Sequence, residues 1–546
     1  MSKFMFPEEV KASISKDHLY TSKLFELVDF NISELRKINL VGLLISSLIL
    51  GSACYKYFVK ERFIEKSSWL FPSTFISTII ISQLPSLWIE RVPAYNNLTS
   101  FISLSIVGLF FFWMCCKSKS ILYPLIIGIL ISMIVIIRVP SGLSLLFSIL
   151  LFMILFRRNK AFQITFLCLG LIIGLVFHFL IIESTTNFIE SMKNGILFHS
   201  YLNNHNDDFI LLRYTKELWG TLIFSFGYNK YLFLITSIVY IWITKFGKTT
   251  WLPYIFYISL IYISLHHFII GDINGGHSLY WFQWRYYFGQ FILFSIILGI
   301  HCLSDNFKNL KLLFSTQFNL SFILLSFPLF FALGTSNIIM YNMNFYTSFF
   351  MIGLFLIFLK IITFGSFSYR NFHIYFLLFL FCLGPAHAYL KSRLSSSFYT
   401  ICEASHGSLH QHNNTLRING NYLYVNDSIQ DLSCNLNDAL SNHRGKLQYL
   451  LNFSTMPGLN FLTALPHPIQ SWTIQMNDNF TLENIEESTF LQSAILIRSN
   501  DTEVIGQLTK CFPNWKISHS KKFTIDYNLG SKIPQLLLFI PNNIEK

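Results

Sequence analysis

The chain has 546 residues, of which 53% are hydrophobic and only 12% are charged, and its mean hydropathy is +0.48. Soluble proteins carry about 25% charged residues. This composition excludes a disordered chain, a collagen, a coiled coil and an ordinary soluble enzyme, and it indicates that lipid surrounds most of the chain. The net charge of +12 does not indicate nucleic-acid binding, because the cations occur singly or in pairs beside apolar runs.

Long apolar runs recur along the first 391 residues. Since a bilayer is crossed by about 20 apolar residues of helix, they predict about twelve transmembrane helices. The predicted spans are 38–58, 69–89, 98–116, 119–137, 140–156, 161–183, 229–246, 251–270, 286–304, 318–335, 345–364 and 372–391. The predicted fold is thus a polytopic α-helical membrane protein with a C-terminal soluble α/β domain. Its parts are an N-terminal polar segment (1–37), a multi-span domain (38–391) and an extracytoplasmic domain (392–546).

Lys and Arg collect in alternate loops, which predicts that those loops are cytoplasmic. The opposite, outer side then receives the loops 89–99, 138–142, 183–230, 271–285 and 334–344, the tail after residue 390 and the segment 1–37. Residues 1–37 contain six acidic and six basic side chains and no signal-peptide pattern. Either this segment is translocated or the span count is wrong by one.

The last 155 residues are rich in polar side chains and contain no run long enough to span a membrane. Residues 416–425 predict a β-hairpin around Asn419 and Gly420. Leucines at helical spacing predict a helix over 429–451, and strands are predicted at 494–498, 522–527 and 535–540.

Three cysteines of the predicted outer domain, Cys402, Cys434 and Cys511, predict one disulfide whose pairing stays open. His406, His410 and His412 lie close together, but they lack a metal-ligand spacing, so no metal site is predicted.

Ionisable side chains at the outer ends of the predicted spans are the candidates for chemistry, because placing them at a membrane boundary is costly. A carboxylate can accept a proton from a hydroxyl group, and arginines can bind a leaving phosphate. The candidate catalytic residues are Glu90, Asp207, Asp208 and Asp272. The candidate substrate- or phosphate-binding residues are Arg91, Arg138, Arg213, His277 and Arg285.

Three short segments carry a family resemblance: 138–142 (RVPSG), 331–337 (FALGTSN) and 456–462 (MPGLNFL), the last followed by Trp472. With the predicted spans, outer loops and outer tail, they resemble the GT-C class of bacterial membrane glycosyltransferases. The resemblance implies transfer of a sugar from a polyprenyl-phosphate carrier on the outer face of the membrane. The chain departs from this class because no long acidic loop follows the first span, so that Glu90 or acidic residues of the N-terminal segment would replace the usual aspartate.

The resulting expectation is a glycosyltransferase of the bacterial inner membrane that acts on an extracytoplasmic glycan such as lipopolysaccharide O-antigen. Direct displacement would use Glu90 as the base and one of the arginines to bind phosphate. The expected partners are the lipid-phosphate sugar, the glycan acceptor and membrane lipids, with no nucleic acid; no cofactor is expected, and a divalent metal is neither required nor excluded. The alternatives are a transporter or lipid-glycan flippase and a non-catalytic scaffold in envelope assembly.

Overall fold

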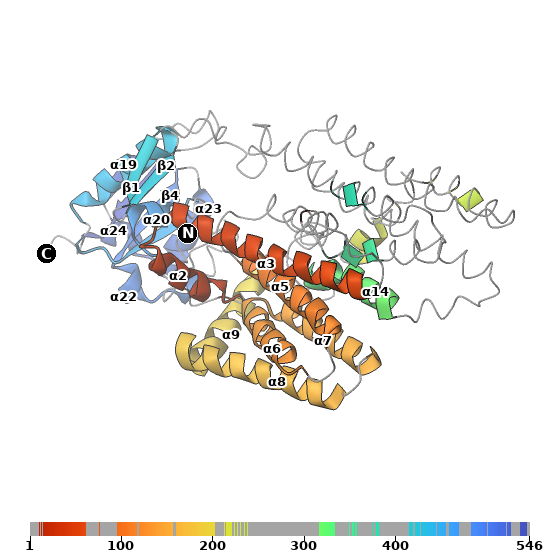
Figure 1. Cartoon of the computed structure of the whole chain (residues 1–546). Helices are drawn as coiled ribbons and strands as arrows, with labels where there is room; N and C mark the ends of the chain where they lie inside the picture. The colour runs from red at the N-terminus through yellow and green to blue at the C-terminus, as the bar shows by residue number, and fades with distance from the viewer. Residues whose placement is uncertain are drawn as a thin grey trace. The chain divides into compact units, whose positions relative to one another are not determined.

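The computed structural model is largely helical over the residues it describes (Figure 1). The described residues are 15–61, 95–116, 120–156, 160–201, 215–220, 316–332, 414–418, 421–425, 427–443, 445–454, 458–468, 482–499, 501–519, 521–525 and 535–542, with scattered single positions. Among them, three helices are long and apolar enough to cross a membrane: Glu34–Lys60, Asn96–Cys115 and Ala161–Ile182.

The chain divides into two compact units. The first comprises Met1–Ile38, Phe179–Phe209 and Ser396–Lys546, and the second comprises Asn39–His178 and Ile210–Ser395. The first unit therefore assembles three segments that are far apart in the sequence.

The long elements that the structure describes in the second unit are apolar helices. Its described helices are α3 (Ile32–Lys60, which begins in the first unit), α5 (Tyr95–Cys115), α6 (Leu122–Ile137), α7 (Val139–Phe156), α8 (Lys160–Phe177) and α14 (Thr316–Ala332). These helices coincide with the predicted spans 38–58, 98–116, 119–137, 140–156, 161–183 and 318–335, although α3 begins six residues earlier than predicted. The other predicted spans, 69–89, 229–246, 251–270, 286–304, 345–364 and 372–391, lie outside the described residues except for scattered positions.

Helices α6 and α8 pack closely because glycine lies where they meet (Figure 1). A Cβ atom on Gly128 of α6 would overlap the Leu167 carbonyl oxygen, and one on Gly170 of α8 would overlap the Leu125 carbonyl oxygen. Small residues that allow backbones to approach are typical of helix pairs in membranes, where packing rather than exclusion from water holds the helices together.

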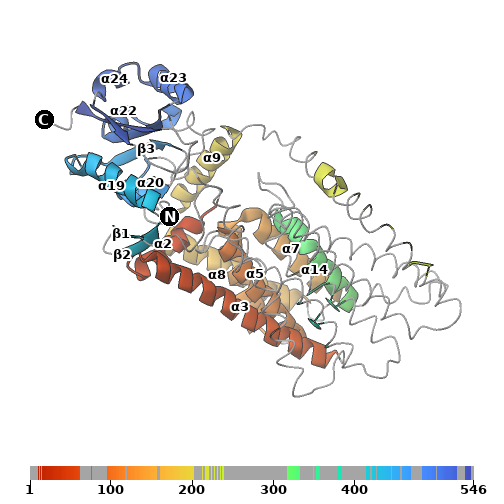
Figure 2. The ribbon, with the colours of Figure 1, turned by 90° about the horizontal axis from the view of Figure 1, so that it is seen from above.

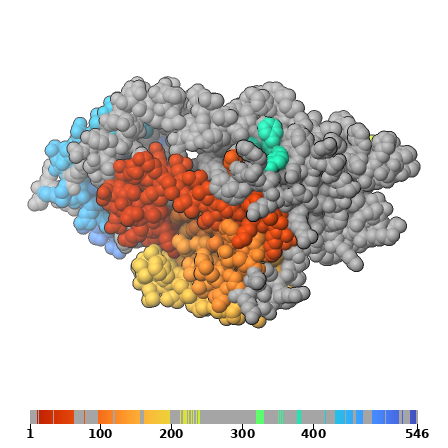
Figure 3. All heavy atoms as spheres, in the orientation of Figure 1, coloured from red at the N-terminus to blue at the C-terminus, as the bar shows by residue number. Residues whose placement is uncertain are grey.

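Helix α3 presents an apolar strip at the surface of the molecule, where its atoms form part of the red band in Figure 3. Leu40, Val41, Leu44 and Ile45 are 53%, 51%, 45% and 51% exposed, and their spacing places them on one side of the helix. An exposed apolar strip of this kind suits a lipid environment.

The first unit joins an N-terminal helix to the C-terminal part of the chain. Helix α2 (Asp17–Leu27) buries Phe25 completely, and the Phe25 ring lies 6.4 Å from the ring of Phe461, centroid to centroid. The middle segment supplies the end of the π-helix η3 (His178–Ile182) and helix α9 (Thr185–Tyr201).

The C-terminal part contains a hairpin and a four-stranded sheet. Strands β1 (Asn414–Ile418) and β2 (Asn421–Val425) pair antiparallel, with Ile418 opposite Asn421, so the predicted hairpin is confirmed. The sheet has the order β3-β4-β6-β5, formed by β3 (Tyr449–Phe453), β4 (Ser493–Arg498), β6 (Leu536–Ile540) and β5 (Lys521–Ile525). Strands β3 and β4 are parallel, and the other two pairings are antiparallel.

Helices cover both faces of the sheet, with α23 (Thr502–Cys511) and α24 (Trp515–Ser518) on one side and α19 (Asp427–Ser441) and α20 (Gly458–Thr463) on the other (Figure 2). Short α22 (Glu487–Phe490) belongs to the first side. Successive strand residues point to opposite faces, so that Leu451 and Ile495 join one core while Leu450 and Leu496 join the other.

The predicted helix over 429–451 is wrong in its second half. Helix α19 ends at Ser441, and Leu450 and Leu451 belong to β3. Leu447 and Leu450 pack into the same core as the leucines of α19, which accounts for their burial without a helix. The strands predicted at 494–498, 522–527 and 535–540 correspond to β4, β5 and β6 within two residues.

Candidate functional site

Arg138 occupies the break between two apolar helices of the second unit. Helix α6 ends at Ile137, Arg138 is extended with φ −153° and ψ 91°, and α7 begins at Val139. The Arg138 amide donates to the Ile134 carbonyl at 2.6 Å, and its own carbonyl accepts from the Gly142 amide at 3.1 Å. Pro140 fits the first turn of α7, where a missing N–H costs no helical hydrogen bond.

The guanidinium of Arg138 is buried, with the residue only 6% exposed. Its Nη1 donates to the Oδ1 of Asn96, at the start of α5, at 3.1 Å. The same end of α5 buries Asn97, Thr99 and Ser100. Because an arginine stays charged, its burial requires polar partners. The α5 end and the α6–α7 break thus form a polar region within otherwise apolar helices.

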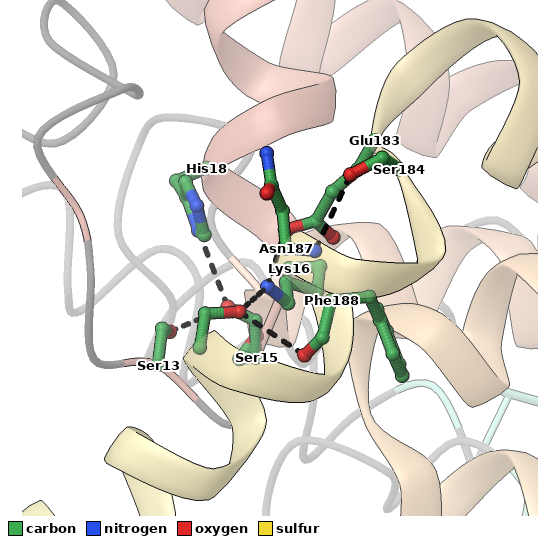
Figure 4. Close-up of polar contacts among 9 residues, drawn as sticks. Ser13, Ser15, Lys16, His18, Glu183, Ser184, Asn187 and Phe188 are labelled. Atoms are coloured by element: carbon green, nitrogen blue, oxygen red, sulfur yellow. Dashed lines mark hydrogen bonds and ion pairs between the residues drawn. The ribbon is translucent and has the colours of Figure 1, made fainter.

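A second polar cluster lies in the first unit, where the N-terminal segment meets the residues after α8 (Figure 4). The Nζ of Lys16 donates to Glu183 Oε1 at 2.7 Å, and the two side chains are only 1% and 10% exposed. Lys16 Nζ also contacts the hydroxyl of Ser191, and it lies 5.2 Å from the centroid of the Phe188 ring. We call this arrangement the Lys16 cluster.

Backbone and side-chain hydrogen bonds fix the segment around Lys16. The Ser13 amide donates to the Ser191 carbonyl at 3.2 Å, and the hydroxyl of Ser15 donates to Asp17 Oδ1 at 3.0 Å. His18 Nδ1 lies 3.2 Å from the carbonyl oxygen of Ser15. The segment is thereby attached to α9 through its backbone, at Ser191, and to Glu183 just before α9 through the charge of Lys16.

Burial and charge oppose each other in the Lys16 cluster. Burial lowers the pKa of Lys16, while the hydrogen bond and negative charge of Glu183 counteract that change. Burial, and then the charge of Glu183, raise the pKa of Tyr20. Ser191 is buried and its hydroxyl donates to the Phe188 carbonyl at 3.2 Å. The cluster is closed to solvent, which suits attachment of the N-terminal segment better than catalysis.

Of the predicted site residues, the structure describes Arg138 and places it as given above. The others, Glu90, Arg91, Asp207, Asp208, Arg213, Asp272, His277 and Arg285, lie outside the described residues. Their assembly into one site therefore stays a prediction. Lys16 and Glu183 are not among the predicted site residues; the signals for them in the sequence are a glutamate at the end of a predicted span and the many charges of residues 1–37.

The described residues contain no group of three or more His, Cys, Asp or Glu side chains that could hold a metal ion. His406, His410 and His412 lie outside them.

The predicted disulfide is wrong. Cys434 and Cys511 are free thiols, and every pair among the three cysteines of this region includes one of them. Cys434 lies on α19 and Cys511 ends α23, so the two lie on helices that cover opposite faces of the sheet. Cys402 lies outside the described residues.

Comparison with known proteins identifies no relative. No family model matches the chain, and no curated protein or solved structure matches it significantly.

Proposed function

We propose that the protein is a multi-pass enzyme of the bacterial plasma membrane that transfers a sugar from a polyprenyl-phosphate carrier to an extracytoplasmic glycan such as lipopolysaccharide O-antigen. The observation that carries the proposal is the buried Arg138 at the α6–α7 break, bonded to Asn96 at the end of α5. A guanidinium at the boundary of apolar helices is costly unless it is paired, solvated or used to bind an anion. The phosphate of a lipid carrier is such an anion, and arginine binds phosphate through two parallel hydrogen bonds.

The proposed topology has about twelve spans and an α/β domain outside the cytoplasm. Its support comes from the first unit, whose three segments, Met1–Ile38, Phe179–Phe209 and Ser396–Lys546, must share one side of a membrane. A chain that leaves a side and returns crosses an even number of times. Six predicted spans lie between residues 38 and 183 and six between 229 and 391, so the prediction meets this requirement at both places. An even number of crossings also favours a translocated N-terminal segment over an error of one span, because one missed span would make the number odd.

The chemistry would be a direct displacement at the anomeric carbon of the donor sugar. An acceptor hydroxyl forms the new glycosidic bond while the bond from the anomeric carbon to the phosphate oxygen breaks. Glu90 accepts the hydroxyl proton, and the lipid phosphate leaves with the bonding electron pair, stabilised by Arg138. Asp207, Asp208 or Asp272 replaces Glu90 if that residue is not the base. Arg91, Arg213, His277 and Arg285 are the further candidates for binding the donor.

The test compares Arg138→Gln and Arg138→Lys with Lys37→Gln, whose lysine is 64% exposed in a surface ion pair. Each variant is expressed in cells that lack the native chain. The amount of modified glycan is measured by mass spectrometry and divided by the amount of the variant protein in the membrane. Arg138→Gln should reduce modification by about 10²–10³-fold, as removal of a donor that stabilises transition-state charge does. Arg138→Lys should retain part of the activity, and Lys37→Gln should leave it unchanged.

Normal modification by Arg138→Gln at normal membrane abundance would contradict the role of Arg138. Glu90→Gln then tests the base independently, because it preserves the shape of the side chain and removes its basicity. If the purified chain transfers no sugar to a purified acceptor, and cells that lack the chain accumulate lipid-linked sugar on the cytoplasmic face of the membrane, the protein is a flippase. If modification persists while envelope complexes fail to assemble, it is a scaffold.

A further inference from the structure

Helix α9 has an exposed apolar side and a buried polar side. Ile189 and Ile196, seven residues apart and so on one face, are 61% and 62% exposed, and Lys193 is exposed between them. On the opposite side Ser191 is buried, contacts Lys16 through its hydroxyl and accepts the Ser13 amide through its carbonyl. At Ser191 the polar side of α9 is thus covered by this chain, whereas Ile189 and Ile196 are exposed.

The chain before α9 indicates what covers that apolar side. Only residues 183 and 184 separate α9 from the apolar stretch Ala161–Ile182, which is long enough to cross a membrane. At the end of that stretch Leu180 and Ile181 are 80% and 65% exposed. Exposed aliphatic side chains therefore continue from the end of a span into the first turns of α9.

Helix α9 itself does not suit a span. Its 17 residues include Glu190 and Lys193, and it rises about 25 Å, less than the hydrocarbon core of a bilayer. A helix with one apolar face and a charged remainder that directly follows a span suits the plane of the membrane surface.

We propose that α9 lies in the headgroup layer of the bilayer, with Ile189 and Ile196 directed toward the acyl chains. Lys193 extends its ammonium group to lipid phosphates, as lysine does at membrane interfaces. The Lys16 cluster lies on the side of α9 away from lipid and holds the N-terminal segment there. The first unit is in this way anchored to the membrane surface, whatever reaction the protein catalyses.

The test uses the full chain in vesicles of phosphatidylethanolamine and phosphatidylglycerol. Benzoylphenylalanine replaces Ile189, Ile196 or, as the matched control on the same helix, the exposed polar Asn187. After illumination, cross-linked products are identified by mass spectrometry. Positions 189 and 196 should give phospholipid adducts in several-fold higher yield than position 187.

Cross-links from 189 and 196 to a second copy of the chain would show a dimer contact and overturn the proposal, as would cross-links to another segment of the same chain. Equal lipid yields at all three positions would overturn it too, because the orientation of the helix would then be undefined. A second measurement does not depend on photochemistry: Ile189→Asp combined with Ile196→Asp should raise hydrogen exchange over α9 in vesicles, and Asn187→Asp should not.

Discussion

Lys16 and Glu183 are each poorly suited to burial alone, and each makes the other acceptable. The Nζ of Lys16 lies 2.7 Å from Oε1 of Glu183, and both side chains are almost completely buried. In the surface pair Lys23–Glu26 on α2, the side chains are 73% and 60% exposed. Burial removes the hydration of both charges. Removing one partner of a buried ion pair therefore destabilises a protein much more than removing one partner of a surface pair. The position of Lys16 in the sequence shows none of this, because its partner is 167 residues away.

Lys16→Met should destabilise the attachment of the N-terminal segment by about 3–5 kcal/mol, because Glu183 is left buried without its cation. Lys23→Met should change it by less than about 1 kcal/mol. Hydrogen exchange of peptides covering α2 and α9 in the solubilised full chain measures both. The double variant Lys16→Met with Glu183→Gln should recover much of the loss, and equal effects of the two single lysine variants would show that the pair is not a stabilising contact.

His467 makes the sheet region sensitive to acid. Burial lowers its pKa to about 3, below the value of about 6.5 of an unfolded chain. The unfolded state therefore binds a proton more readily than the folded state does. The contribution of neutral His467 to the free energy of unfolding is complete above pH 6.5 and is lost as the pH falls toward 3. Between pH 7 and 5 the loss should be about 2 kcal/mol.

Hydrogen exchange over β3 and β4, corrected for the intrinsic pH dependence, measures this loss. His467→Gln should flatten the profile between pH 7 and 5. It should not abolish the slope, because burial also lowers the pKa of His519, whose Nε2 lies 3.1 Å from the Ser493 carbonyl oxygen. An unchanged slope in His467→Gln would show that folding does not lower the pKa of His467.

At the scale of elements, the apolar runs predicted helices well where they are long, since about 20 apolar residues have few other stable arrangements in a membrane. The same reasoning failed over 429–451, where leucines at helical spacing occur in a helix, a turn and a strand in succession. The spacing of leucines alone does not distinguish a helix from a turn or a strand. Leu450 and Leu451 lie on opposite faces of the sheet, and this sheet forms only when distant segments of the chain come together. The candidate site was less predictable still, since the partner of Arg138 is set by how α5 packs on the α6–α7 break.

The α6–α8 contact should tolerate no side chain at its glycines. Gly170→Ala places a methyl group against the Leu125 carbonyl, whose carbon would lie 2.9 Å away, so the helices must separate. The expected cost is about 1–3 kcal/mol, typical of overpacking. Gly42→Ala in α3 is the control, because its nearest neighbour would be Phe101 at 3.6 Å, an ordinary contact. The melting temperature of the solubilised chain should fall for Gly170→Ala alone; an equal fall in both would refute close packing at α6–α8.

At the scale of the whole molecule, the proposed topology places the three segments of the first unit on one side of the membrane, and the distribution of Lys and Arg predicts that this is the outer side. Native cysteines allow a direct test. Cys434 is exposed on α19. Cys116 follows α5 and ends the predicted span 98–116, next to a loop predicted to be cytoplasmic.

A membrane-impermeant maleimide added to intact spheroplasts should modify Cys434 and a cysteine introduced by Lys23→Cys on α2, but should modify Cys116 only after permeabilisation. Peptide mass spectrometry reads all three sites from the same sample, so Cys116 controls for leakage. Protection of both Cys434 and position 23 until permeabilisation would reverse the orientation and remove the basis for outer-face sugar transfer. Modification of one and protection of the other would separate α2 from the sheet, contradicting the packing of Phe25 against Phe461. Only labelling of both in intact spheroplasts, with Cys116 protected, is consistent with an even number of crossings on each side of α9 and with the proposed extracytoplasmic domain.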